Sequence, residues 1–237
     1  PLCGVRLQRM WEELAASSDY AARRAAIDAH NATGSSLRRG IGMQAIKFGI
    51  SFTATLLNQA GALLLVYADG SVQLNHGGTE MGQGLHTKML KICSKELGVD
   101  PAQIRVMRTS TDKVPNTSAT AASSGTDLNG QAVAAACRQV KERMDAVRAT
   151  LPGDPSFAEV ALQCWVRQIS LAASGFYATP DIGYDRKAGH GKPFHYFAYG
   201  VAVSEVEVDT LTGELRTLRA DILHDVGDSI VPAIDIG

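Results

Sequence analysis

Two stretches of the sequence combine small residues with hydrogen-bonding side chains where a helix is expected to start. Residues 77–88 read GGTEMGQGLHTK, and residues 119–130 read ATAASSGTDLNG. Glycine lets a backbone approach a ligand closely, and the first turn of a helix presents N–H groups that the helix itself does not use. Together the two stretches could face one polyanionic or heteroatom-rich ligand, although each alone could equally be a plain connecting loop.

The first stretch matches neither of the common nucleotide-binding patterns. A P-loop ends in Gly-Lys-Ser/Thr, and a dinucleotide fold carries Gly-x-Gly-x-x-Gly at a strand-to-helix turn. Residues 77–88 contain neither pattern. We expect a helix that begins near Gly82 or Gln83 and leaves its first N–H groups free, while the Gln83 amide can both donate and accept hydrogen bonds.

The remaining reactive side chains do not form a recognisable catalytic set. The six histidines have neither metal-ligand spacing nor a nucleophile motif beside them. His76 is the best-placed ligand candidate, but a hydrogen-bonded structural histidine is the more ordinary role. Glu80 could act as a general base, whereas carboxylates near turns usually cap a helix or face solvent. The four cysteines are too widely spaced for a zinc or iron-sulfur site.

The bulk composition is that of an ordinary globular protein. The chain has 237 residues, of which 45% are hydrophobic and 20% charged, and its formal net charge is -1. Such a balance gives no broad attraction to nucleic acid or to anionic lipid, so we expect small-molecule or protein partners. The apolar stretches are shorter than the roughly 20 residues that cross a bilayer. We therefore expect a soluble, cytoplasmic protein without a membrane or nucleic-acid partner.

The elements that must position the two stretches follow an α+β pattern. Residues 1–40 are helical in character and are expected to form an arm or linker, and residues 41–237 form the main domain. Thr126 or Asp127 is expected to cap one helix. Period-two and apolar segments predict strands in residues 40–53, 61–68, 71–77, 102–110, 194–210 and 215–227, and helical spacing predicts helices in residues 82–98, 127–147 and 157–171.

Long segments of the chain resemble a known family. KFGISFTATLLNQAGALLLVYADGSVQLNHGGTEMGQGLHTKM, TSATAASSGTD, FHYFAYGVAVSEVEVDTLTGEL and DVGDSIVPAIDIG are similar to the molybdenum-binding part of the xanthine dehydrogenase family of molybdenum hydroxylases. The likeness is strongest over residues 42–130 and 194–237. It implies mixed strands and helices that form part of a two-lobed molybdopterin-binding region, with residues 41–237 an incomplete portion of that domain.

The resemblance also implies an activity for a larger parent protein. Members of the family hydroxylate hypoxanthine and xanthine to urate at a molybdopterin-bound molybdenum centre, using water. Electrons then pass through Fe-S clusters and FAD to NAD in other domains or subunits, and the parent is expected to be a homo-oligomer. Two alternatives stay open: an aldehyde oxidase-like or other N-heterocycle hydroxylase, and a noncatalytic structural or dimer-contact module.

The resemblance assigns roles to particular residues of this chain. Cofactor contacts are implied on two loops, at Met81, Gly82 and Gln83 and at Ala122, Ser123, Ser124, Gly125 and Thr126. Substrate contacts are implied at Phe52, Thr53, Ala121 and Ala122. No residue is expected to bind the metal directly. The family's general base is a glutamate in a Gly-Glu-Pro-Pro segment, which does not occur here. We therefore expect it beyond residue 237, and we expect the chain to be an excerpt that is inactive alone.

Overall fold

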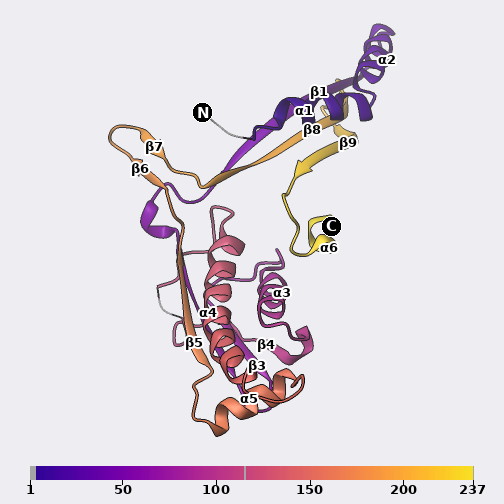
Figure 1. The fold of residues 1–237 in the computed structure, drawn as a ribbon. Helices are drawn as coiled ribbons and strands as arrows, with labels where there is room; N and C mark the ends of the chain where they lie inside the picture. Colours follow the sequence, from indigo (N-terminus) through magenta and orange to yellow (C-terminus); the bar gives the residue numbers. More distant parts are fainter. Residues whose placement is uncertain (1–3, 115, 237) are drawn as a thin grey trace. The chain divides into compact units, whose positions relative to one another are not determined.

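The computed structural model describes residues 4–114 and 116–236, which form two compact units (Figure 1). Unit 1 comprises Pro1–Gly49 and Phe197–Gly227, and unit 2 comprises Ile50–Tyr196 and Asp228–Gly237. The first boundary between the units lies within strand β1 (Leu37–Ile50). The combination of helices with mixed sheets confirms the α+β class.

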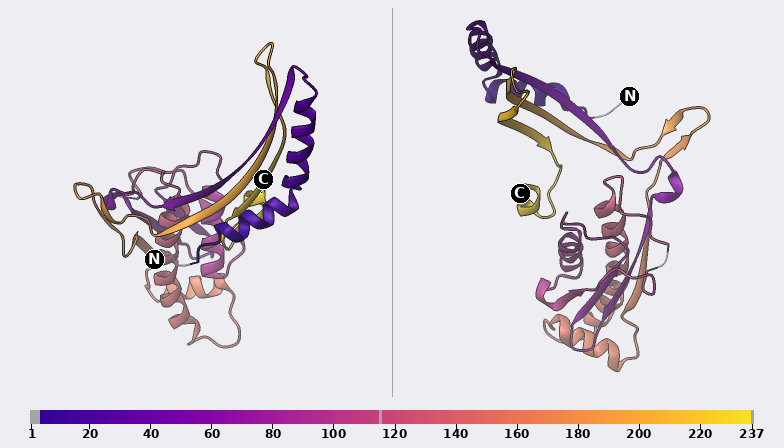
Figure 2. Two further views of the ribbon diagram at one scale, coloured as in Figure 1. Left: turned by 90° about the horizontal axis from the view of Figure 1, so that it is seen from above. Right: turned by 180° about the vertical axis from the view of Figure 1, so that it is seen from behind.

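Unit 1 is a three-stranded sheet covered by two helices. The strand order is β1-β8-β9, where β8 is Tyr196–Asp209 and β9 is Leu215–Asp225. Helices α1 (Leu7–Ser17) and α2 (Tyr20–Ala32) follow the sheet in both views of Figure 2. Their apolar side chains share a core with those of the sheet, made of Met10, Leu14, Ile27, Ile41, Tyr199, Val201 and Val203. The first two helices are thus part of a packed unit.

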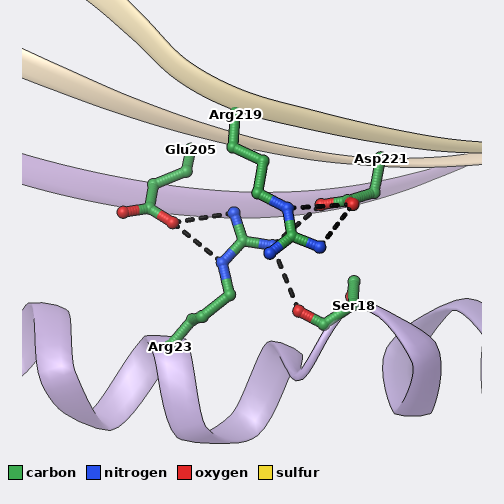
Figure 3. A network of polar contacts seen from close by, with 5 residues as sticks. All are labelled: Ser18, Arg23, Glu205, Arg219 and Asp221. Carbon is green, nitrogen blue, oxygen red and sulfur yellow. Dashed lines mark hydrogen bonds and ion pairs between the residues drawn. The ribbon is translucent and has the colours of Figure 1, made fainter.

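A polar network fastens α2 to this sheet (Figure 3). Arg23 Nε donates to Glu205 Oε2 over 2.8 Å, and Arg23 Nη1 donates to Asp221 Oδ2 over 2.8 Å and to the Ser18 carbonyl over 3.1 Å. Arg219 Nη2 donates to Asp221 Oδ1 over 2.7 Å. The Arg23 guanidinium is mostly buried, so its two carboxylate partners offset the cost of removing the charge from water.

Unit 2 contains a four-stranded sheet in the order β4-β3-β2-β5. The β3–β4 pair is parallel and the other pairs are antiparallel. The strands are β2 (Gln59–Val66), β3 (Val72–His76), β4 (Ile104–Val106) and β5 (Ala172–Ala178). Helices α3 (Leu85–Leu97) and α4 (Gly125–Arg148) lie side by side against it, and α5 (Phe157–Val166) contacts α4.

The packing of α4 on β5 depends on one glycine. A Cβ added to Gly175 would lie 1.9 Å from the carbonyl oxygen of Ala132 and 2.7 Å from the backbone nitrogen of Ala136. Only a residue without a side chain permits this approach. The core beneath includes the fully buried Leu64, Leu74, Met89, Val133 and Val140.

Short elements complete the chain. They are the 3-10 turns Thr55–Leu57 and Pro101–Gln103, the hairpin of β6 (Gly183–Asp185) and β7 (His190–Lys192), and helix α6 (Pro232–Ile236). Neither β5 nor this hairpin is among the strands predicted from the sequence. Within the described part of the chain, no helix is both long enough and apolar enough to cross a membrane.

Two expected helix starts were wrong. Helix α3 begins at Leu85 rather than at Gly82 or Gln83, because Gly82 and Gly84 have positive φ angles of +100° and +76°. These left-handed conformations interrupt a right-handed helix. Helix α4 has Ser124 at its N-cap position, so Thr126 and Asp127 lie inside the first turn instead of capping it.

Candidate functional site: two adjoining loops

The glycine loop, residues 77–84, connects β3 to α3 and is folded around one carboxylate. Glu80 Oε1 accepts hydrogen bonds from the N–H groups of Gly82 over 2.9 Å and Gly84 over 3.0 Å, and Glu80 Oε2 accepts from His86 N–H over 2.9 Å. These bonds, the one from His86 first, lower the pKa of Glu80 below its ordinary value. The expectation of free N–H groups here was therefore wrong, because the protein's own carboxylate occupies the start of α3.

The tip of the glycine loop is open on its outer side. Gln83 Oε1 accepts from Met81 N–H over 2.6 Å, and Gln83 Nε2 donates to the Thr79 carbonyl over 2.9 Å. Each of these amide atoms keeps a second hydrogen-bonding position. Met81 is 67% exposed, and a Cβ added to Gly82 would meet no atom within 4 Å. The loop is thus held internally while its surface stays accessible.

The buried His76 and the half-buried His86 form a hydrogen-bonded pair next to the loop. His76, which is 1% exposed, accepts a hydrogen bond from Gly78 N–H at Nδ1 over 3.1 Å, and its Nε2 lies 2.9 Å from His86 Nδ1. Because Nδ1 is an acceptor, the proton of neutral His76 sits on Nε2 and is donated to His86. Burial lowers the pKa of His76 to about 4. Its contacts are those of a structural histidine.

The side chains of the described residues form no metal-ligand set. Within residues 4–114 and 116–236, no three His, Cys, Asp or Glu side chains are grouped closely enough to hold a metal ion.

The serine loop, residues 117–124, leads into α4 through a strained turn. Ala122 and Ser123 have φ angles of 55° and 53°, so two consecutive residues with side chains adopt the left-handed conformation. That conformation costs roughly 1–2 kcal/mol per residue and is found preferentially at functional sites. Ser124 is buried and its hydroxyl donates to the Ala121 carbonyl over 3.2 Å. Ser123 is exposed, and within the described residues no hydrogen bond is made by the hydroxyls of Ser123 and Thr126.

Direct contacts join the two loops. Thr79 N–H donates to Thr120 Oγ1 over 2.8 Å. A Cβ added to Gly77 would lie 2.2 Å from Thr117 Oγ1, so glycine at this position is what allows the loops to touch. A Cβ added to Gly78 would lie 2.5 Å from a methyl carbon of Leu85 at the start of α3. The structure thus places the two expected sets of cofactor residues on adjoining loops.

The expected substrate residues Phe52 and Thr53 lie on a third segment, residues 51–58, which connects β1 to β2. Both side chains are half-buried. This segment reaches the serine loop through the start of β2, where the Gln59 carbonyl accepts from Ser118 N–H over 3.3 Å. Gly61 N–H donates to Thr117 Oγ1 over 3.2 Å in the same region.

Sequence reasoning missed two side chains that organise the site. These are Thr120, which joins the loops, and Asn58, whose amide contacts the Phe52 backbone. Glu80, for which the sequence left capping and general-base roles open, folds the glycine loop by accepting bonds at the start of α3. Nothing comparable marks Thr120 or Asn58.

Comparison with known sequences identifies the family to which the chain belongs. The family model for the molybdopterin cofactor-binding domain matches residues 13–237. The chain is 52% identical over 234 residues to the xanthine dehydrogenase/oxidase of Felis catus, covering 99% of this chain and 18% of that protein. It is 50% identical over 234 residues to the xanthine dehydrogenase of Dictyostelium discoideum, covering 98% and 17% respectively. The chain therefore spans less than a fifth of the length of these relatives.

Solved structures share the fold. Quinoline 2-oxidoreductase from Pseudomonas putida 86 superposes with a TM-score of 0.80 at 19% identity, over 97% of this chain and 32% of that one. The aldehyde oxidoreductase from Desulfovibrio desulfuricans ATCC 27774 gives a TM-score of 0.79 at 21% identity, over 97% and 24%. At such identities the likeness establishes the fold alone.

Proposed function

Since this chain belongs to the molybdopterin cofactor-binding domain family, we propose that its glycine loop and serine loop hold the pterin part of a molybdopterin cofactor. The observation that carries the proposal is the hydrogen bond of 2.8 Å from Thr79 N–H to Thr120 Oγ1, which joins the two loops. The cofactor residues are Met81, Gly82 and Gln83 on one loop and Ala122, Ser123, Ser124, Gly125 and Thr126 on the other.

The groups on these loops fit a pterin. Its ring nitrogens and carbonyl need donors and acceptors, and the Gln83 amide and the Ser123 and Thr126 hydroxyls can supply both. The left-handed turn at Ala122 and Ser123 fixes the backbone before the ligand binds. Carboxylates lie at both helix starts, Glu80 at α3 and Asp127 in the first turn of α4. The groups left free on the two loops, the Gln83 amide and the Ser123 and Thr126 hydroxyls, are therefore suited to the ring heteroatoms of a pterin.

We further propose that the parent protein hydroxylates hypoxanthine and xanthine. The support is identity of about 50% to relatives named xanthine dehydrogenase over nearly the whole chain. When bound, the cofactor supplies the two-electron redox chemistry of molybdenum. Phe52 would stack on the flat purine, the Thr53 hydroxyl would bond to it, and Ala121 and Ala122 would leave room beside it. Fe-S clusters, FAD and NAD belong to other parts of the parent, as does the general base.

The cofactor proposal is tested with Gln83→Ala in the full-length protein. We expect several-fold less molybdenum and pterin per subunit, because the variant loses both the loop-closing bonds and the free amide positions. Gln131→Ala is the matched control, since Gln131 is an exposed glutamine on α4 whose side chain bonds to none of the described residues. Equal molybdenum and pterin contents in the two variants and the wild type would count against the assignment.

The substrate proposal is tested by the turnover of the full-length protein. We expect xanthine to be oxidised with a higher kcat/KM than aldehydes. The reverse preference would support the aldehyde oxidase-like alternative, and loaded protein that turns over neither class would support a noncatalytic module.

A further inference from the structure

We propose that Asn58 is the positioning residue that fixes the substrate-facing segment, residues 51–58, and thereby sets the affinity for the flat substrate. The inference rests on the proposed substrate role of Phe52 and Thr53. It assigns to Asn58 no contact with the substrate itself.

The Asn58 side chain grips the backbone of Phe52 at two points. Phe52 N–H donates to Asn58 Oδ1 over 2.7 Å, and Asn58 Nδ2 donates to the Phe52 carbonyl over 2.9 Å. Asn58 Nδ2 also lies 3.3 Å from the Thr55 carbonyl. The planar amide thus pairs with one residue of backbone much as a neighbouring strand would. At 2% exposure, Asn58 is shielded from the water that would compete for these bonds.

Asn58 is itself fastened to the sheet of unit 2. Its carbonyl accepts over 3.0 Å from the N–H of Thr179, the residue after β5, whereas its own N–H donates within the segment to the Thr55 carbonyl over 3.0 Å. The next residue, Gln59, begins β2 and pairs with Ala178 of β5. Through these backbone and side-chain bonds, Asn58 fixes the Phe52 backbone relative to the sheet.

Within the described residues, the Asn58 side chain is the only group that bonds to the Phe52 backbone. Ser51, just before Phe52, has a φ angle of +135°, a conformation that residues with side chains rarely adopt. A strained backbone persists only where its surroundings hold it, and the Asn58 amide is the buried group that holds both sides of Phe52.

The start of β2, next to Asn58, also contacts the serine loop. Gln59 accepts from Ser118 N–H over 3.3 Å, one residue after Asn58. Asn58 consequently links the placement of the Phe52 ring to the loop that carries Ala121 and Ala122. A shift of about 1 Å in a residue that positions the substrate can cost on the order of a hundredfold in rate. Loss of the Asn58 bonds to Phe52 should therefore change the measured rate constants.

The test uses the full-length protein and xanthine. Asn58→Asp keeps an acceptor for Phe52 N–H but loses both donated bonds and places a carboxylate against two carbonyl oxygens. We expect its KM for xanthine to rise about tenfold or more, with molybdenum per subunit unchanged, because only substrate orientation is lost. Asn58→Ala removes the grip entirely and serves as a second variant in case the aspartate impairs folding.

Two comparison variants separate the explanations. Asn75→Asp alters an asparagine of β3 that is also 2% exposed and bonds to Leu63 rather than to the segment, so it should leave KM at the wild-type value. A KM unchanged in both Asn58 variants, or matched by Asn75→Asp, overturns the inference. Phe52→Ala tests the wall itself: if it raises KM and the Asn58 variants do not, only the inference on Asn58 fails. If Phe52→Ala has no effect, the proposed wall is wrong and the inference fails with it.

Discussion

The buried His76, which bonds to His86, makes the stability of the glycine loop depend on pH in a predictable direction. The pKa of His76 is lowered to about 4 in the folded loop, first by burial and then by the nearby His86, while Glu80 opposes the shift. In an opened loop it returns to about 6.5. The opened form therefore binds a proton first as the pH falls, so stability is complete above about pH 6.5 and is lost progressively down to about pH 4.

The magnitude follows from the size of the shift. Each pKa unit corresponds to about 1.4 kcal/mol, so the full shift of His76 is worth about 3 kcal/mol. Lowering the pH from 7.5 to 5 traverses about 1.5 units of that interval, which amounts to about 2 kcal/mol. Opening of the loop should become roughly thirtyfold more frequent over this range.

Amide hydrogen exchange of peptides spanning residues 76–88 in the full-length protein measures this opening, after correction for the intrinsic pH dependence of exchange. The informative variant is His76→Asn, whose side-chain oxygen can still accept from Gly78 N–H but cannot titrate. Any pH dependence that persists in the variant comes from groups other than His76. The difference between wild type and variant isolates His76.

Two results would refute the reasoning. Wild-type protection that is as flat with pH as that of the variant would mean that His76 titrates alike in the closed and opened loop. Protection that rises at pH 5 would mean that a protonated His76 is favoured by the fold, contrary to its burial and its acceptor role.

Two further substitutions test the packing of each unit. Arg23→Met keeps the aliphatic stem but leaves Glu205 without its partner, so it should lower the free energy of unfolding of unit 1 by roughly 2–3 kcal/mol in thermal melts, against less than about 1 kcal/mol for the exposed control Arg24→Met. Equal losses would contradict the role of the network. Gly175→Ala drives a Cβ into the backbone of α4 and should cost more than about 3 kcal/mol, seen as loss of soluble protein, and a stable variant would show that β5 and α4 can separate at little cost.

Local patterns in the sequence were enough to find the loops and most of their flanking elements. Helix α3 follows the spacing of Leu85, Met89 and Leu97, and it ends at Gly98 in a left-handed C-cap, as expected. Strand β5 was missed for a physical reason. Its sequence AASGFYA lacks β-branched residues, because the close approach of α4 at Gly175 requires small side chains where a typical strand has large ones.

The bonds inside the site could not be read from the sequence, because each depends on a turn that had first to be known. Glu80 reaches three N–H groups up to six residues ahead only because Gly82 and Gly84 bend the chain back over it. The Thr79–Thr120 bond joins positions 41 residues apart, and no local pattern specifies such a pairing. The Asn58 amide likewise meets Phe52 only after the turn at Thr55–Leu57 has formed.

The backbone N–H groups of the glycine loop bond to Glu80, and this explains why the loop differs from a phosphate-binding loop. A P-loop leaves backbone N–H groups free for the phosphate oxygens, whereas here Glu80 has taken the N–H groups of Gly82, Gly84 and His86. At α4 the first turn contains Asp127, whose Oδ2 accepts from the Tyr196 hydroxyl over 2.9 Å. Glycine therefore serves here to bend the chain back over Glu80 and to let the two loops touch.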